Sequence, residues 1–202
     1  DACYDIEYEY PWGFDELEGI ASRTDYDLKK HAEYSGAKLS YFDQQKKDPE
    51  TGKNGWRYTP YVIEPSAGAT RGLLVYLMDA YCEETVKDAN GKETSRVVMK
   101  LHPKLAPFKV AVLPLIKKDG LPEIARNLVN QFMKAGINAR YDEQHAIGKR
   151  YRRHDEAGTP LCITLDFQSL EDQTVTVRNR DSMEQERIHQ KEVTSYLKEL
   201  LG

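Results

Sequence analysis

Cysteine is scarce in this sequence of 202 residues, which contains only Cys3, Cys82 and Cys162. The three lie far apart, without the paired spacing of a zinc site, and they are too few for the disulfide framework of a small secreted domain. We therefore expect free thiols and a reducing compartment.

Long apolar runs are also missing. No stretch approaches the roughly 18 consecutive apolar residues that span a bilayer, and no charged segment followed by an apolar one opens the chain. The sequence therefore predicts a cytoplasmic protein with no membrane partner. An alternating pattern starts directly at Asp1 without a preceding Met, so we interpret the chain as a piece of a longer polypeptide.

Neither sign of charge dominates. The chain carries 29 Lys or Arg and 33 Asp or Glu, with 40% hydrophobic residues, as in an ordinary globular protein. Residues 1–104 have 14 cations and 19 anions, whereas residues 105–202 have 15 and 14. This mild asymmetry favours different partners for the two halves.

The most informative stretch is residues 61–71, Tyr-Val-Ile-Glu-Pro-Ser-Ala-Gly-Ala-Thr-Arg, which an apolar run over residues 72–78 follows. The pattern predicts a buried strand that ends at Glu64, a turn through Pro65 and Gly68, and then a helix. This turn would bring a charged strand end close to a helix N-terminus.

Two charges in this stretch oppose the local preferences. A buried Glu64 carboxylate needs a cation or a ligand. Arg71 lies in the first helical turn, where the macrodipole disfavours a cation by about 0.3–1 kcal/mol, whereas the free N–H groups of that turn suit a phosphate. An anionic ligand with a planar group for Arg71 would explain both charges. The equally weighted alternative is an ion pair between Glu64 and a neighbouring arginine, with Arg71 reaching the surface.

Acidic residues recur near the start of the chain. Residues 4–10 and 15–21 alternate as strands do, and we expect Glu16 and Glu18 to share one strand face. Together with Glu64 they are candidates for an acidic pocket. The alternative, again with equal weight, is that these carboxylates are simply exposed.

Local signals predict three further elements in the first half. They are a helix capped by Thr24 and ended by Gly36, a hairpin over residues 40–60 with a lysine-rich tip, and a second hairpin that turns at Asn90-Gly91. Two prolines within residues 102–107 then mark the boundary between two expected domains, residues 1–104 and 105–202.

The second half has a cleaner pattern of strand, helix, strand, helix and strand, followed by a final strand and helix. The expected ranges are 109–116, 122–135, 137–141, 147–157, 160–167, 174–178 and, for the segment containing the last helix, 183–201. This order implies parallel strands with crossover helices, to which the final strand is added antiparallel. The fold class is α/β.

A basic cluster lies in this second half. Its members are Lys149, Arg150, Arg152 and Arg153 around Tyr151 on one helix, and Arg178 and Arg180 on one face of an expected edge strand. Cations beside an aromatic ring suit phosphate contact and base stacking. The alternative is a surface helix balanced by Asp155 and Glu156. No nucleophile with its base, Gly-rich phosphate loop or zinc spacing occurs in this half, which therefore looks like a binding domain.

Several motifs, in a fixed order, make the whole chain resemble the C-terminal part of a class II glycyl-tRNA synthetase of the homodimeric type. The matching residues are 16–21, 23–25, 61–66, 101–103, 105–107, 147–153, 170–172, 174–178 and 183–185. In that family Gly-x-x-Arg at a helix start is the third class-defining motif, which here is Gly68-Ala-Thr-Arg71. The residue before the arginine, often Asp in relatives, is Thr70. The resemblance implies the end of an antiparallel-sheet catalytic domain followed by an α/β anticodon-binding domain with a mixed sheet and flanking helices.

The resemblance also implies site residues. Those for ATP are Glu16, Leu17, Gly68, Ala69, Thr70 and Arg71, with Arg71 as the catalytic residue that lies against adenine. Those for glycine are Glu18, Glu64, Pro65, Ser66, Ala67 and Gly68. Charge and strand face alone suggest Lys149, Arg152, Arg178 and Arg180 for tRNA, and no residue is assigned to a metal.

The implied activity is ATP-dependent activation of glycine to glycyl-adenylate and transfer to tRNA-Gly by a homodimeric full-length enzyme. ATP with Mg²⁺ is a substrate, and no tightly bound cofactor is expected. The first two class motifs would lie upstream of Asp1, so we expect this chain alone not to activate glycine. The alternative is a non-catalytic nucleic-acid-binding relative, such as a polymerase accessory subunit. Retention of the carboxylates and of Arg71 argues for the enzyme, and the first 104 residues argue against a free-standing RNA-binding module.

Overall fold

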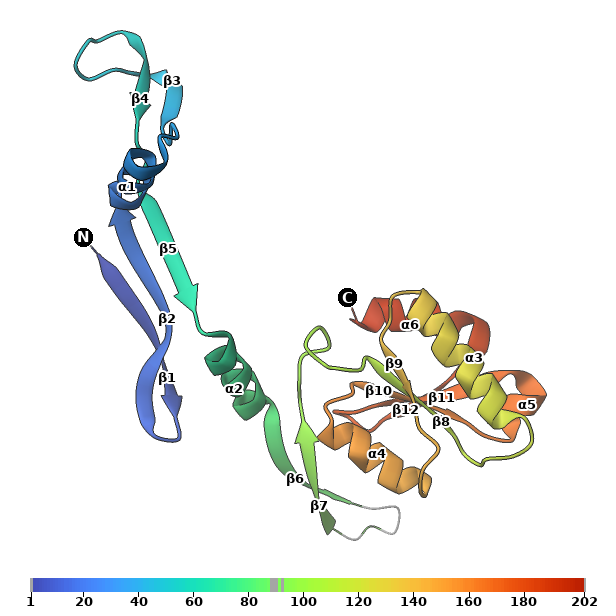
Figure 1. Ribbon diagram of the computed structural model, residues 1–202. Coiled ribbons are helices and arrows are strands. Elements are labelled where there is room, and N and C mark those ends of the chain that lie inside the picture. Colours follow the sequence, from blue (N-terminus) through green and yellow to red (C-terminus); the bar gives the residue numbers. More distant parts are fainter. Residues whose placement is uncertain (1, 88–90, 92, 202) are drawn as a thin grey trace. The chain divides into compact units, whose positions relative to one another are not determined.

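A computed structural model of the chain describes residues 2–87, 91 and 93–201 (Figure 1). The chain divides into two compact units, Asp1–Val75 and Tyr76–Gly202. The second unit thus includes a hairpin that precedes the boundary expected after residue 104. The boundary expected after residue 104 stays a prediction.

The first unit is built on an antiparallel sheet with the strand order β1-β2-β5. β1 (Cys3–Tyr10) and β2 (Gly13–Thr24) form a hairpin, and β5 (Val62–Ala67) pairs with the other side of β2. Pro65 lies inside β5 opposite Ile20, so the expected turn through Pro65 is wrong. Among the described residues β5 pairs with β2 alone, and an edge strand tolerates proline.

The predicted helices of the first unit are confirmed. α1 (Tyr26–Ser35) ends at Gly36, whose φ of 70° is left-handed, as expected for a C-cap. The predicted N-cap is wrong, because Asp25 occupies that position and Thr24 ends β2. α2 (Ala69–Ala80) starts soon after β5 and continues into the second unit.

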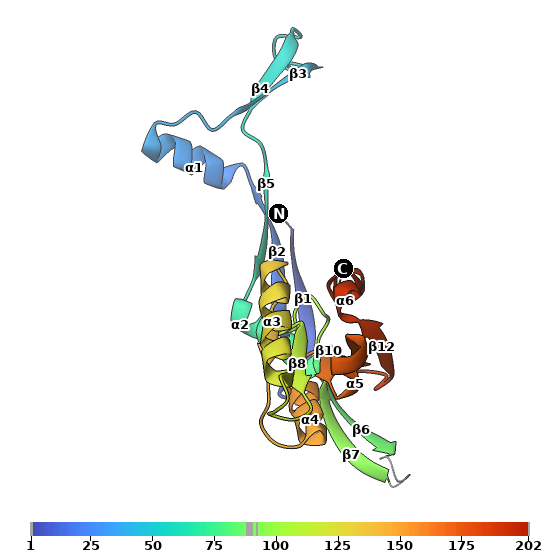
Figure 2. The ribbon, with the colours of Figure 1, turned by 90° about the vertical axis from the view of Figure 1, so that its right-hand side faces the viewer.

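The predicted hairpin over residues 40–60 is also present. β3 (Tyr41–Lys47) and β4 (Asn54–Tyr58) pair antiparallel as a separate two-stranded sheet (Figure 1, Figure 2). Gly55 of β4 has a φ of 93° and lies under the ring of Phe42. A side chain at this position would collide with that ring, so the strand requires glycine here.

The second unit contains a hairpin and a five-stranded mixed sheet with the order β12-β11-β10-β8-β9. The strands and helices, in chain order, are β6 (Tyr81–Lys87), β7 (Glu93–Met99), β8 (Val110–Pro114), α3 (Leu121–Lys134), β9 (Ala139–Tyr141), α4 (Ile147–Glu156), β10 (Leu161–Leu165), α5 (Gln168–Asp172), β11 (Thr174–Asn179), β12 (Gln185–His189) and α6 (Gln190–Leu201). β8 pairs parallel with β9 and β10, as predicted from the alternation of strands and helices.

Helices cover both faces of this sheet (Figure 1). On one face Leu128 and Phe132 of α3 and Leu197 of α6 pack against Val112 and Ile163. On the other face Ile147 and Tyr151 of α4 pack against Ala111, Leu113 and Cys162. The fully buried β8 and β10 explain why these strands read as continuous apolar runs rather than as alternating ones.

Two expectations for the end of the chain are corrected. β11 pairs antiparallel with β10 as predicted, but β12 lies on its other side, so β11 is an interior strand and not the edge. The segment 183–201 contains this additional strand before α6. Alternation in Gln-Glu-Arg-Ile-His is short and mostly polar, which hides a strand. The predicted turn residue Asn90 lies outside the described residues.

Candidate functional site

Arg71 projects from the first turn of α2 toward the hairpin of β1 and β2. Its Nη2 lies 2.9 Å from Oδ2 of Asp15, and its Nη1 donates to the backbone oxygen of Glu16. The guanidinium carbon is 5.7 Å from the ring centre of Tyr10. The Asp15 carboxylate offsets the unfavourable placement of a cation at a helix N-terminus.

Asp15 is itself held in place. Its Oδ1 accepts the backbone N–H of Glu16 at 2.8 Å, and its Oδ2 lies 3.4 Å from the indole nitrogen of Trp12. The hydrogen bond from Arg71, followed by these two, holds the pKa of the Asp15 carboxyl below its usual value. Sequence reasoning missed Asp15, because nothing local distinguishes it from its acidic neighbours.

A buried aromatic ring supports this arrangement. Tyr10 is only 3% exposed and stacks on Trp12 with ring centres 4.7 Å apart and planes 3° from parallel. The ring of Tyr8 meets Tyr10 edge-on at 5.1 Å. Arg71 therefore lies over a rigid platform, which fixes where its guanidinium can point.

Strand register separates two of the predicted acidic residues. Glu16 pairs with Glu7 and Glu18 pairs with Ile6, because the register shifts by one residue between them. Consecutive residues of β1 point to opposite faces, so Glu16 and Glu18 lie on opposite faces of the sheet. The expectation that they share a face is wrong, because an extra residue at Leu17 interrupts the alternation.

Glu16 shares its face with the predicted glycine-binding residues of β5. Ser66 lies opposite Gly19, and Glu64 lies opposite Ala21, on the same face. A Cβ added to Gly19 would lie 3.2 Å from Oε1 of Glu16 and 3.7 Å from Oδ1 of Asp5. This face therefore combines carboxylates with small residues, whereas Glu18 lies beside Ala67 on the other face.

Glu64 is not buried, contrary to expectation. Its side chain is 50% exposed, and one carboxylate oxygen lies 3.5 Å from Nε of Arg23, which also binds Asp27 at 2.8 Å. The alternative pairing of Glu64 with a neighbouring arginine is thus present. Glu64 is exposed because β5 is an edge strand in the part of the chain that the structure describes. The apolar residues before Glu64 had suggested a buried strand instead.

The corner between β5 and α2 is open along its whole length. The predicted ligand-binding residues here are all exposed: Glu64, Pro65, Ser66, Ala67, Gly68, Ala69 and Thr70. A Cβ added to Gly68 would lie 3.6 Å from the side chain of Arg71, which is an ordinary van der Waals contact. Its role is therefore not to relieve a clash inside the chain. Leu17 is partly buried in the neighbouring strand.

The four cations predicted for tRNA have different surroundings. Lys149 is exposed and has no charged partner among the described residues. Arg152 is exposed but donates to the backbone oxygen of Ser95 at 2.8 Å. Arg178 and Arg180 are 6% and 3% exposed. The structure therefore brings only Lys149 and Arg152 to the surface of α4.

Arg178 and Arg180 take structural roles instead, which corrects their expected exposure. Arg178 forms two hydrogen bonds with Asp155, at 2.8 and 3.1 Å, and lies over the ring of Tyr151. Arg180 donates to the backbone oxygens of Leu101 and Gly158 at 3.0 and 2.9 Å. Arg178 lies on the face of β11 that Asp155 and Tyr151 of α4 cover. Arg180 lies just after β11, where these two backbone oxygens accept its hydrogen bonds. Asp155, expected to balance a surface helix, is also buried.

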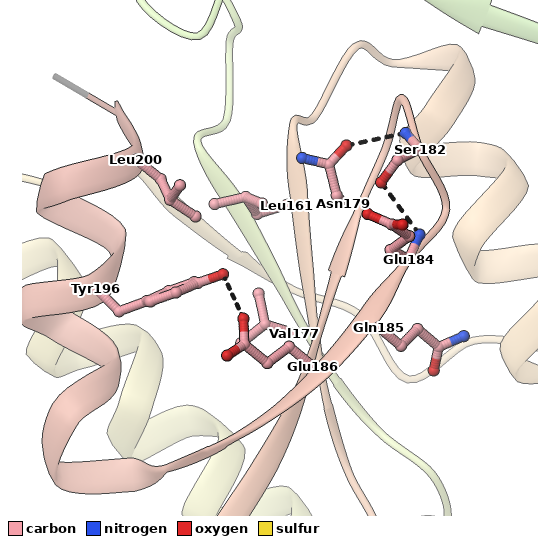
Figure 3. Close-up of a pocket in the computed structure, with 9 residues that line it drawn as sticks. All are labelled: Leu161, Val177, Asn179, Ser182, Glu184, Gln185, Glu186, Tyr196 and Leu200. Atoms are coloured by element: carbon pink, nitrogen blue, oxygen red, sulfur yellow. Dashed lines mark hydrogen bonds between the residues drawn. The ribbon is translucent and has the colours of Figure 1, made fainter.

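A cavity of 460 Å³ lies elsewhere in the second unit, between β11, β12 and α6 (Figure 3). Tyr196 donates to Glu186 across it at 3.0 Å, and Asn179 accepts the backbone N–H of Ser182 at 3.1 Å. None of the residues predicted for tRNA lines this cavity. Sequence patterns gave no sign of it, because its walls depend on β12.

Comparisons with known proteins extend over the whole chain. Residues 109–200 match the protein family described as "Anticodon binding domain". The chain is 52% identical to a protein named glycine–tRNA ligase from Treponema denticola, over 97% of this chain and 42% of that protein. It is 53% identical to proteins of the same name from Clostridium perfringens and Geobacillus kaustophilus, over 100% of this chain and 41% of each.

These matches confirm the resemblance that the motifs indicated, for the fold as well as for the family. The chain spans about two fifths of the length of the curated relatives it matches. In the described part of the chain, no helix is both long and apolar enough to cross a membrane.

Proposed function

Because this chain is homologous over its whole length to glycine–tRNA ligases, we propose that it is part of an enzyme that joins glycine to tRNA with ATP. The observation that carries the proposal is this identity of about one residue in two across both units. ATP with Mg²⁺ would enter as a substrate, and we assign no residue of this chain to a metal. The full-length enzyme is proposed to be a homodimer.

In this proposal Arg71 lies against the adenine of ATP. Its guanidinium is already oriented by Asp15 and Tyr10, and it is 41% exposed, so one side of it is available to a ligand. Glu16 and Leu17 line the same nucleotide site, together with Gly68, Ala69 and Thr70 at the start of α2. Backbone N–H groups at a helix start favour a negatively charged ligand.

Glycine is proposed to bind on the sheet face that carries Glu64, Ser66 and Glu16. Carboxylates there match the α-ammonium of the substrate, and Pro65, Ala67 and Gly68 form the adjoining backbone. Gly19 lies opposite Ser66, and a Cβ added to it would lie 3.2 Å from a carboxylate oxygen of Glu16. Such a filled face supports the exclusion of amino acids whose side chain is larger than the hydrogen of glycine. Excluding a larger substrate by steric contact is easier than rejecting a smaller one. Glu18 points to the other face, so we leave it out of this pocket.

The reaction requires little acid–base catalysis by the protein. Attack of the glycine carboxylate on the α-phosphate forms glycyl-adenylate and expels pyrophosphate. This step needs the attacking and leaving groups held in line and the developing charge stabilised. Residues outside this chain would complete the phosphate contacts. We therefore expect the isolated chain to be inactive in glycine activation.

The second domain is proposed to bind the anticodon of tRNA-Gly. The match to the anticodon-binding family supports this role. Lys149 and Arg152 on α4 are the candidates for contact with RNA. A phosphate contact should affect all tRNA sequences equally, whereas a base contact should set sequence preference.

The proposal is tested by ATP–pyrophosphate exchange with the full-length parent polypeptide, offered each amino acid in turn. Exchange with glycine alone is expected, and Arg71→Ala and Glu64→Gln should abolish most of it. Glu33→Gln, an exposed carboxylate on α1, is the matched control and should retain wild-type exchange. Folded protein that binds nucleic acid but exchanges with no amino acid would overturn the enzyme and favour a non-catalytic relative.

A further inference from the structure

The hairpin of β3 and β4 differs in charge from the rest of its unit. Residues 41–58 carry four lysines or arginines and three carboxylates, whereas the remainder of residues 1–75 carries five and eleven. Two of the hairpin carboxylates accept hydrogen bonds from its own backbone, and one of them, Asp43, also lies 3.7 Å from Nζ of Lys46. Asp48 accepts the N–H groups of Glu50 and Thr51 at 2.8 and 3.0 Å, and Asp43 accepts that of Gln45 at 3.0 Å. The hairpin thus carries a net charge of +1, whereas the rest of its unit carries −6.

Aromatic rings on one face of the hairpin form a stack. The rings of Trp56 and Tyr58 have centres 4.3 Å apart and planes inclined by 25°, and Tyr41 meets Tyr58 edge-on at 5.9 Å. Nζ of Lys46 lies 5.8 and 5.6 Å from the centres of Trp56 and Tyr58. A cation thus sits beside a flat platform of two rings.

The opposite face repeats this combination. The guanidinium of Arg57 lies 5.2 Å from the ring centre of Phe42, which is 44% exposed. Lys47 and Lys53 are exposed near the tip and have no acidic partner among the described residues. Each face of the hairpin therefore offers a ring with a cation next to it.

The stack also faces an open cleft. Trp56, Tyr58 and Tyr61 line a space of 560 Å³ together with Asp25, Lys29 and Thr59. In both ribbon views the two strands stand without a helix laid over them (Figure 1, Figure 2). This space can accept flat groups of the size of a nucleobase.

We propose that the β3–β4 hairpin is an RNA-contact surface that holds the tRNA substrate. Unpaired bases stack on Trp56 and Tyr58, and the cations Lys46, Lys47 and Arg57 contact phosphates. Base stacking on aromatic rings combined with backbone neutralisation is the mode by which proteins grip single strands. The positive charge of the hairpin attracts a polyanion such as RNA, whereas the acidic rest of the unit repels it. Within this unit, RNA would therefore bind at the hairpin. The identity of the RNA as tRNA rests on the proposed function.

The test uses the full-length protein and two independent readouts. Lys46→Gln/Lys47→Gln should weaken tRNA binding several-fold at low salt and reduce the slope of log affinity against log salt by about 1–2, since each lost phosphate contact removes roughly one counterion. Lys30→Gln/Lys38→Gln, on and just after α1, is the control and should leave both unchanged. Glycine-dependent ATP–pyrophosphate exchange, which needs no tRNA, should be unaffected in every variant.

A second pair of variants tests the stacking platform. Trp56→Leu should weaken tRNA binding by about tenfold or more, because it removes a ring on which a base stacks. Tyr34→Leu is the matched control, since Tyr34 is 83% exposed on α1. Wild-type tRNA affinity and salt slope in all hairpin variants would overturn the proposal even if exchange persists. Unchanged tRNA binding with a loss of dimer in sedimentation would overturn it in favour of contact with a second copy. If the wild-type protein shows no glycine-dependent exchange, the proposed function is overturned instead. The binding measurements would still show whether the hairpin contacts RNA.

Discussion

The carboxylate of Asp15 lies 2.9 Å from the guanidinium of Arg71, although 56 residues separate the two in sequence. Both groups belong to one small array with the Tyr10 ring and the backbone oxygen of Glu16. The array fixes the direction of the arginine before any ligand binds. In the proposed enzyme Asp15 is thus a positioning residue for the contact with ATP.

Asp15→Asn is expected to raise the KM for ATP by a few-fold in glycine-dependent exchange, while the KM for glycine changes little. The effect is modest because the ion pair is open to solvent, where screening weakens it. Steady-state exchange at varied ATP and varied glycine measures both constants. Asp79→Asn, on the same helix as Arg71 but far from its first turn, is the control. Equal changes in both KM values would indicate a general loss of structure instead.

Strand register leads to a prediction about two neighbouring glutamates. Glu16→Gln should reduce glycine activation far more than Glu18→Gln, because only Glu16 shares the sheet face of Glu64 and Ser66. We expect at least a tenfold ratio in kcat/KM for glycine, which corresponds to about 1.4 kcal/mol. Exchange kinetics of the two full-length variants provide the comparison. A greater loss in Glu18→Gln would contradict the assignment of the faces.

Asp155 joins buried cations from two segments. It binds Arg178 of β11 at 2.8 Å and Arg96 of β7 at 3.3 Å, and Arg96 also pairs with Glu84 of β6. Asp155→Asn leaves two buried cations without full neutralisation and should lower the free energy of unfolding by about 3–5 kcal/mol. Urea unfolding of the wild type and the variant measures this difference in the free energy of unfolding. The adjacent, exposed Glu156→Gln serves as the control, and a similar small effect of both substitutions would refute the structural role of Asp155.

Gly158 combines a left-handed backbone with a crowded Cβ position. Its φ is 74°, and an added Cβ would lie 2.7 Å from Cδ1 of Leu101 and 3.2 Å from the backbone oxygen of Met99. Gly136 has a φ of 81° but nothing within 4 Å. Both changes to alanine incur the backbone cost, about 1–2 kcal/mol, whereas Gly158→Ala should lose about 1–3 kcal/mol more from overpacking. Paired urea titrations test this difference, and equal losses would show that Leu101 moves away freely.

The pair of Asp166 and Arg187 predicts a dependence of stability on pH. Hydrogen bonds from Arg187, and then from Ser169, lower the pKa of Asp166 from 3.8 to about 2. A carboxyl whose pKa is depressed on folding stabilises the fold above its unfolded pKa and loses this contribution as the pH falls toward the folded value. Asp166→Asn should therefore cost on the order of 1–2 kcal/mol at pH 7, and the difference from wild type should shrink between pH 4 and pH 2. Unfolding midpoints at pH 7, 4 and 3 check the trend, which a constant difference would contradict.

The sequence by itself determined the elements whose signals are local. Gly36 ends α1 where predicted, the runs over residues 109–116 and 160–167 contain the buried strands β8 and β10, and the alternation of strands with helices gave the parallel pairing. The motif order was sufficient for the family, because an ordered set of short motifs is far more specific than any one of them. It also located the corner at residues 64–71, where the proposed site lies.

Tertiary structure decided which face, edge or partner each side chain has. A single extra residue at Leu17 moves Glu16 and Glu18 to opposite faces, and no periodicity can reveal it without the partner strand. Arg178 appeared available for RNA, but Tyr151 and Asp155 of α4 cover it, and Asp155 neutralises its charge. Asp15 became part of the site only through its contact with a residue 56 positions away. Such facts depend on long-range pairing, whose energy comes from contacts that local composition does not encode.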